Sequence, residues 1–148
     1  MTMQDRLTEA MKEAMRAKDS LRLNTVRLIR SAVKNREIDA RRALDDQEVV
    51  AILSTLVKQR RESAQAYRDG GRPELADKEE QELAVIQEFL PVQLGEEEVR
   101  GIIEEAIAET GAASMKDMGK VMKVVTARTV GRAEGRVVSE LVKARLAS

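Results

Sequence analysis

The side chains that could carry chemistry in this chain are mainly carboxylates, because the sequence contains neither histidine nor cysteine. Without histidine there is no side chain that ordinarily titrates near neutral pH, and no imidazole to bind a metal. Without cysteine there is no thiolate nucleophile, disulfide or thiolate metal site. Catalysis would fall to Asp, Glu, Lys, Ser, Thr or Tyr. The sequence therefore predicts no catalytic residue, no metal site and no cofactor.

Two acidic runs are the strongest candidates for a carboxylate site. The first run comprises Asp77, Glu79, Glu80 and Glu82, and the second comprises residues 96–98. Helix residues one or two positions apart point in different directions, so neither run is expected to bring a carboxylate pair together. Acidic side chains near the start of a helix stabilise the positive end of its dipole, and that structural role is the favoured interpretation.

Rows of basic residues at helical spacing could bind phosphates. Arg27, Arg30 and Lys34 fall on one helix face, and Arg41 continues the row after an interruption at Ile38. On the next predicted helix, a similar row comprises Lys58, Arg61 and Arg68. A charged row opposite an apolar stripe is usually the solvated face of an amphipathic helix, which is the favoured interpretation of both rows.

The C-terminal segment holds the stronger basic group. The candidate nucleic-acid-binding residues are Lys116, Lys120, Lys123, Arg128, Arg132 and Arg136. Residues 114–148 carry eight basic and three acidic side chains, whereas residues 96–109 carry six acidic and one basic. Phosphate binding and a solvated face stay open as alternatives. Since no aromatic residue lies in this region, any RNA recognition would use the backbone and the shape of the RNA rather than base stacking.

Two other features limit the function classes. The formal net charge is zero, which argues against a protein that coats nucleic acid indiscriminately. Gly119, Gly131 and Gly135 lie among basic residues, but they lack the spacing of a P-loop and no strand precedes them. Turns and close packing are the favoured roles of the last two glycines.

The elements that position these residues are predicted to be helices, because good helix formers dominate and only two residues are aromatic. Six of the predicted ranges are 3–17, 20–43, 46–67, 73–90, 96–110 and 115–130; a last helix follows Gly135. Gly70 and Gly71 should end the third helix, and Pro73 should lie in the first turn of the fourth.

Local signals also predict the caps and the buried stripes. Asp19 or Ser20 is expected to cap the second helix, and Ser114 and Asp117 to form a capping box. The apolar stripe of the first helix is expected to comprise Leu7, Met11, Ala14 and Met15. That of the helix after Ser114 is expected to comprise Met115, Met118, Met122 and Val125.

The fold is therefore predicted to be all-α, with an N-terminal four-helix part and a C-terminal three-helix part. Pro91 ends the fourth helix, which predicts domains at residues 1–92 and 93–148. The N-terminus has charges every few residues, and no stretch approaches the length of a transmembrane helix. A cytoplasmic location and no membrane partner are expected on these grounds.

The same segments resemble the YqeY-like family, in order along essentially the whole chain. The matching segments are KEEQELAVIQEFLPVQLGEEEV at 78–99, SMKDMGKVMKVV at 114–125, GRAEGRVVSELVKARL at 131–146, NTVRLIRSAVKNREID at 24–39 and KQRRESAQAYRDGGRPEL at 58–75. Two positions differ from the usual pattern. Lys123 stands where a small residue, usually glycine, is common, and Gly95 replaces a serine or threonine that would cap a helix.

The family is named jointly with GatB, the B subunit of the tRNA-dependent amidotransferase. The resemblance implies a C-terminal three-helix unit similar to the tail of GatB, which contacts the tRNA body. It also brings a label of carbon–nitrogen ligase with glutamine as amido donor. Neither the kinase-like body of GatB nor the serine–lysine machinery of the amidase subunit has a counterpart in this chain, and a shared tail does not transfer catalysis.

The leading hypothesis is a non-catalytic helical adaptor whose basic C-terminal unit binds tRNA or an aminoacylation-related complex. The second hypothesis is a protein–protein adaptor or homodimer that uses the methionine stripe as an adaptable surface. The third is an accessory component of a glutamine-dependent amidotransferase, which ranks last because no nucleophile, base or metal set is visible.

Overall fold

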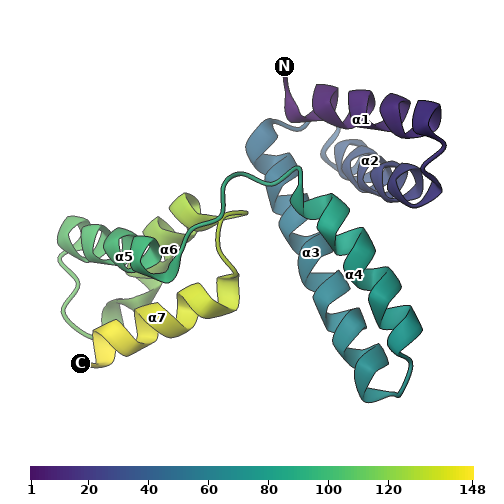
Figure 1. Cartoon of the computed structure of the whole chain (residues 1–148). Helices are drawn as coiled ribbons and strands as arrows, with labels where there is room; N and C mark the ends of the chain where they lie inside the picture. The colour runs from purple at the N-terminus through teal and green to yellow at the C-terminus, as the bar shows by residue number, and fades with distance from the viewer. The chain divides into compact units, whose positions relative to one another are not determined.

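The computed structural model describes residues 1–148, and it contains helices but no strands. The elements are α1 (Met3–Ala17), α2 (Ser20–Ala40), α3 (Asp46–Asp69), α4 (Pro73–Gln87), α5 (Glu96–Thr110), the 3-10 helix η1 (Met115–Asp117), α6 (Met118–Thr129) and α7 (Gly135–Ala147) (Figure 1). The predicted all-α class is confirmed. No helix combines the length and the apolar character needed to cross a membrane. The chain divides into two compact units, residues 1–90 and 91–148.

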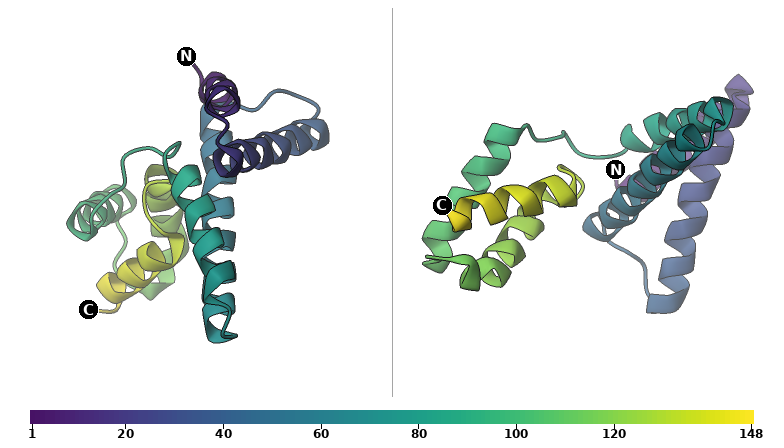
Figure 2. Two further views of the ribbon diagram at one scale, coloured as in Figure 1. Left: turned by 45° about the vertical axis from the view of Figure 1, so that its right-hand side comes forward. Right: turned by 90° about the horizontal axis from the view of Figure 1, so that it is seen from below.

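The first unit contains two helical hairpins that share one core. Helices α1 and α2 lie side by side, and α3 and α4 form a longer antiparallel pair (Figures 1 and 2). Leu7, Ile29, Leu53 and Ile86 are fully buried, one from each helix, and Phe89 joins them just beyond α4. Burial of each such side chain contributes roughly 1.5–3 kcal/mol, so this core determines how the two hairpins pack.

Most helix ends follow the local signals in the sequence. The Asp19 side chain accepts a hydrogen bond from the Arg22 N–H and caps α2, and Pro73 occupies the first turn of α4, as predicted. Two ends differ from the prediction by three residues. Helix α2 stops at Ala40 because Arg41 adopts a left-handed conformation with φ of 57°. Helix α4 stops at Gln87, three residues before the predicted end.

The buried stripe of α1 also differs from the prediction. Its buried residues are Met3, Leu7, Ala10 and Ala14, of which Leu7 is fully buried. Met11 is half-buried, and Met15 is 50% exposed. The pattern is shifted because α1 packs mainly on α2, which turns the face with Ala10 towards the core and leaves Met15 largely in solvent.

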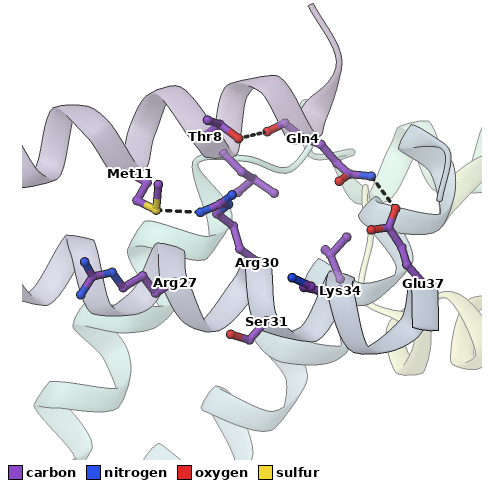
Figure 3. Close-up of a pocket in the computed structure, with 10 residues that line it drawn as sticks. Gln4, Thr8, Met11, Arg27, Arg30, Ser31, Lys34 and Glu37 are labelled. Carbon is purple, nitrogen blue, oxygen red and sulfur yellow. Dashed lines mark hydrogen bonds between the residues drawn. The ribbon is translucent and has the colours of Figure 1, made fainter. Parts of the chain in front are cut away.

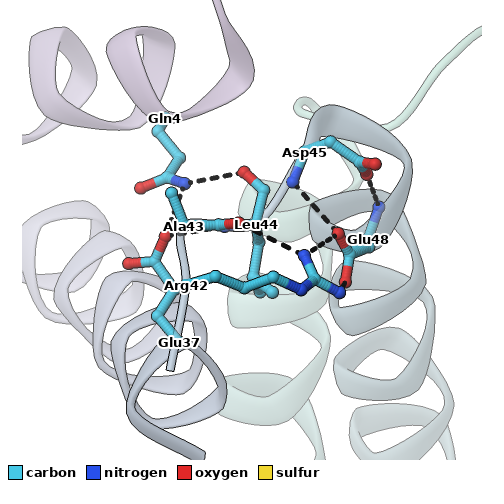
Figure 4. A network of polar contacts seen from close by, with 7 residues as sticks. All are labelled: Gln4, Glu37, Arg42, Ala43, Leu44, Asp45 and Glu48. Carbon is cyan, nitrogen blue, oxygen red and sulfur yellow. Dashed lines mark hydrogen bonds and ion pairs between the residues drawn. The ribbon is translucent and has the colours of Figure 1, made fainter. Parts of the chain in front are cut away.

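A polar network joins the end of α2 to α1 and to the start of α3 (Figure 4). The Glu37 carboxylate accepts hydrogen bonds from the Leu44 N–H at 2.9 Å and from the Gln4 side-chain amide at 3.1 Å. Gln4 also donates to the Leu44 carbonyl at 3.3 Å. The hydrogen bonds to Glu37 lower its pKa below the ordinary value, and the bond from the Leu44 N–H has the largest effect. Glu37 thereby ties the α2–α3 loop to α1.

The next residues of the loop begin α3 (Figure 4). Asp45 and Glu48 form a reciprocal capping box, and Arg42 donates to both oxygens of Glu48 at 2.7 Å. The bonds from Arg42, followed by that from the Asp45 N–H, lower the pKa of Glu48 to about 2. The ion pair of Glu48 with Arg42 and its capping box with Asp45 therefore fix the start of α3.

The first acidic run has a role that the sequence reasoning did not assign. Its members lie on α4 beyond the first turn and pair with arginines of α3. Arg60 Nε lies 2.9 Å from Glu82 and 3.4 Å from Glu79, and Arg68 pairs with the other two carboxylates. The run therefore joins the two helices of the hairpin instead of only complementing the dipole of α4.

The second unit packs α5, α6 and α7 around a small aliphatic core. Its fully buried residues include Val99, Ile103, Val121, Val125 and Val142. Gly111 ends α5 in the left-handed conformation, with φ of 68°, as expected of a helix-terminating glycine. The segment before α5 belongs to this unit, since the N–H of residue 94 donates to the carbonyl of residue 132 at 2.7 Å.

Independent folding of the two units is a testable prediction. Ile86→Ala in the first core and Ile103→Ala in the second each truncate a fully buried side chain, at a cost of roughly 2–5 kcal/mol. We expect each change to lower amide hydrogen-exchange protection only in its own unit. Equal loss of protection in both units, for either variant, would show one cooperative fold instead.

The Glu48 network predicts a pH dependence. The pKa of Glu48 falls from an ordinary 4.5 to about 2 on folding, so its ion pair stabilises the fold fully above about pH 5. That stabilisation is lost as the pH falls from about 5 to about 2. Glu48→Gln should lower the free energy of unfolding at neutral pH and flatten its acid dependence.

The measurement is urea unfolding of both proteins at a series of pH values. Glu62→Gln is the matched control, because Glu62 is an exposed glutamate of the same helix outside the network. The prediction would be contradicted if the free energy of unfolding fell with decreasing pH in the same way for the Glu48 variant and the parent chain.

Candidate nucleic-acid interface

Three of the six predicted nucleic-acid-binding residues lie close together in sequence on consecutive elements. Lys116 lies on η1, and Lys120 and Lys123 lie on α6. All three side chains are exposed, and none forms an ion pair. We call this set the lysine face. It leaves three ammonium groups free to bind an external anion.

The turn before α6 positions the lysine face. Ser114 and Asp117 form the predicted capping box around η1. The single predicted helix therefore begins as a 3-10 turn and continues as α6. The Asp117 carboxylate accepts from the backbone N–H of Ala113 at 2.9 Å, and this bond is the main cause of its lowered pKa. Although Lys120 is near, Asp117 is chiefly engaged by the backbone.

Arg128 is arranged differently, because α5 supplies carboxylates to it. Its guanidinium lies 2.6 Å from Glu109 and 3.4 Å from Glu105. The hydrogen bond to Glu109 is the first cause that raises the pKa of Arg128. Arg128 thus connects α6 to α5, and its charge is largely balanced within the unit.

Arg132 lies in the turn before α7, and Arg136 lies in the first turn of α7. Arg132 Nε donates to the Val92 carbonyl at 3.3 Å, which braces the segment before α5. Arg136 lies 3.4 Å from Glu140, one turn further along α7, with both side chains mostly exposed. Exposed pairs of this kind contribute little stability, so Arg136 is held only weakly.

The structure therefore separates the six residues into the lysine face and three arginines with internal partners. Residues 91–148 contain nine basic and nine acidic side chains, so the positive C-terminal segment is offset within its own unit. Sequence reasoning missed Glu105 and Glu109 as partners of Arg128. The only signal was the excess of acid on the preceding helix, because the pairing depends on how α5 packs against α6.

The second unit also contains a groove between two of its helices. A groove of about 330 Å³ is lined by α5 and α7 residues that include Arg100, Glu104 and Arg145. Arg100 pairs with Glu96, and Arg145 pairs with Glu104, so these charges have partners. No group of three carboxylates is placed to hold a metal ion.

The methionine stripe of α6 lies mostly against the core. Met118 and Met122 are half-buried and pack on the valine cluster, whereas Met115 is 41% exposed. Val121 and Val125 are fully buried and form the centre of the stripe. The buried face of α6 is therefore centred on Val121 and Val125. The methionines expose less surface than the sequence pattern suggested.

Comparison with known proteins identifies the relatives of this chain. A family model described as Yqey-like protein matches residues 4–146. The chain is 37% identical over 119 residues to the mitochondrial "Altered inheritance of mitochondria protein 41" of Vanderwaltozyma polyspora, covering 76% of this chain and 64% of that protein. The Eremothecium gossypii protein of that name is 41% identical over 62% of this chain and 52% of its own length. The Pyrenophora tritici-repentis protein of that name is 30% identical over 84% of this chain and 72% of its own length.

These relatives are longer than the matched region, since the chain spans about half to two thirds of the length of the first two. Their names place them in mitochondria, which contradicts the predicted cytoplasmic location. That prediction was wrong because it rested on the lack of an apolar leader or membrane span, and neither feature distinguishes one aqueous compartment from another. The resemblance seen in the sequence is confirmed by the match across nearly every residue: this chain belongs to the YqeY-like protein family.

Proposed function

We propose that this protein is a helical adaptor that binds structured RNA, tRNA in the first place, through the lysine face. The observation that carries the proposal is the set of three exposed lysines without carboxylate partners on η1 and α6. The resemblance of this unit to the tRNA-contacting tail of GatB supports the same ligand.

The spacing of the lysines suits a phosphate backbone. Lys116 and Lys123 are seven residues apart, which corresponds to roughly 10 Å along a helix. Each lysine carries a hydrated point charge on a flexible stem, which can follow neighbouring phosphates without fixed geometry. The second unit has no aromatic residue on which a base could stack. The proposed contacts are therefore to phosphates and sugars of a folded RNA.

The three arginines would act in different ways. Arg136 is 83% exposed in its side chain and can exchange Glu140 for a phosphate at little cost. Arg128 would chiefly position the lysine face, because it joins α6 to α5, whereas Arg132 would position the segment before α5. All six predicted residues thus remain in the proposal, with two of them as positioning residues.

The alternatives have weaker support. A protein–protein adaptor or homodimer would need exposed methionine, and Met118 and Met122 are half-buried. An accessory role in an aminoacylation or amidotransferase complex is compatible with RNA binding, but no surface feature specifies such a partner. The names of the relatives mention neither RNA nor an enzyme.

The proposal predicts salt-dependent tRNA binding. Each lysine–phosphate contact releases counterions, so the affinity should fall with a log–log slope of about −0.7 to −0.9 per contact. Lys120→Gln should weaken binding and flatten that slope by about one contact. The measurement is fluorescence anisotropy of labelled tRNA across a salt series.

Lys58→Gln is the matched control, because Lys58 is an exposed lysine of the first unit without an ion pair. We expect this variant to bind tRNA like the parent chain. Two results would refute the proposal: no tRNA binding at low salt, or binding that survives neutralisation of the whole lysine face.

The absence of histidine and cysteine also predicts that the purified chain does not hydrolyse glutamine or ATP. Ammonia and phosphate release should equal the buffer control over hours. Reproducible turnover that co-purifies with the protein and disappears with a point variant would contradict this prediction and favour the enzyme-component hypothesis.

A further inference from the structure

The groove between α1 and α2 is a second cationic site, in the first unit and separate from the lysine face. It has a volume of about 550 Å³, which falls in the range of about 300–1,000 Å³ typical of small-ligand sites. Its lining includes Arg27, Arg30 and Lys34, the basic row that sequence analysis assigned to a solvated face. The structure places this row on one wall of a groove, opposite a second helix (Figure 3).

The charges in this groove are poorly balanced. None of Arg27, Arg30 and Lys34 forms an ion pair, although arginines elsewhere in the unit do. The one carboxylate in the lining is Glu37, whose hydrogen bonds go to Gln4 and to the backbone of the α2–α3 loop, and whose pKa the nearby Lys34 also lowers, as the smallest of the causes. Three cations therefore face one carboxylate that is already engaged, and the groove attracts anions.

Arg30 reaches across the groove towards α1 (Figure 3). Its guanidinium nitrogen lies 2.7 Å from the sulfur of Met11, and no other hydrogen bond engages this side chain. A thioether is a weak acceptor, whereas a guanidinium offers five donors in a fork that suits phosphate. A phosphate oxygen would replace the sulfur with a net gain in hydrogen bonding.

The α1 wall and the adjacent part of α2 supply uncharged polar groups. Both bonds of the Gln4 amide nitrogen are made within the fold, which leaves its carbonyl oxygen available as an acceptor. Ser31 is exposed in the lining and makes no hydrogen bond with its hydroxyl. These groups can bind the hydroxyls of a sugar, while the half-buried Met11 offers a small apolar contact.

We propose that the α1–α2 groove binds a small phosphorylated, hydroxyl-bearing ligand of nucleotide size. Arg27, Arg30 and Lys34 bind its phosphates, and Gln4 and Ser31 bind its sugar hydroxyls. The residues of this site and those of the lysine face belong to different units.

The test uses the full chain and two probes without magnesium, adenosine triphosphate and tripolyphosphate. Calorimetry gives the affinity, and backbone NMR shifts of Gln4, Thr8 and Ser31 report whether binding occurs in the groove. We expect the nucleotide to bind more tightly than tripolyphosphate. Arg30→Gln with Lys34→Gln should weaken nucleotide binding by about tenfold or more, since a hydrogen bond to a charged group contributes roughly 1.5–3 kcal/mol.

Lys58→Gln with Lys78→Gln is the matched control, since it removes the same charge from exposed positions of this unit outside the groove. Lys120→Gln tests independence from the lysine face. Both variants should bind the nucleotide like the parent chain. Circular dichroism checks that each variant is folded, and Lys34→Gln alone provides a milder change if the double variant is not.

Four results would overturn the proposal. They are no nucleotide binding at millimolar concentration and low salt, equal losses in the groove and control variants, shifts located away from α1 and α2, and tripolyphosphate binding at least as tightly as the nucleotide. Absence of nucleotide binding would mean that the basic row is only solvated or binds a macromolecule. Tripolyphosphate binding at least as tight as that of the nucleotide would mean that Gln4 and Ser31 bind no sugar.

Discussion

The hydrogen bonds of Glu37 are the constraint on which the α2–α3 loop and one end of the α1–α2 groove depend. This half-buried carboxylate holds the Leu44 N–H and the Gln4 side chain, so one residue of α2 fixes both α1 and the loop into α3. Leu44 enters the core at 7% exposure, and the cap of α3 follows directly. The same carboxylate closes one end of the cationic groove, so structure and proposed binding share it.

The two units distribute their charges by a common rule. Each contains equal numbers of acidic and basic residues, seventeen of each in the first and nine of each in the second. Arg60, Arg68 and Arg128 pair with carboxylates of a neighbouring helix, whereas the lysine face pairs with none. A planar guanidinium makes directed bonds at a helix seam, and a flexible ammonium gains less from being fixed there. The lysines that remain in solvent are thus available to external anions.

The two cores are almost entirely aliphatic. Valine, leucine, isoleucine and alanine fill them almost completely, with Phe89 as the one buried aromatic residue. Two buried polar residues, Thr25 and Thr129, donate to the carbonyl four positions earlier in their own helices. Two further buried side-chain oxygens, Ser54 Oγ and Glu79 Oε2, have no hydrogen-bond partner, and Glu79 lies beside Arg60.

The sequence alone determined the helical class, the family and most helix ends, because caps such as Asp19, Pro73 and Gly111 act within about one turn of themselves. It did not determine the early end of α2 at Arg41, where a residue other than glycine takes a left-handed conformation. The sequence also pointed to the six basic residues as candidates. It did not show that the three lysines lack partners while the arginines have them, since the partners of Arg128 lie 19 and 23 residues away on α5. Helical periodicity gives the face on which a side chain lies. Only the packing of one helix against another decided that Arg128 meets carboxylates, and that the row from Arg27 to Lys34 borders a groove.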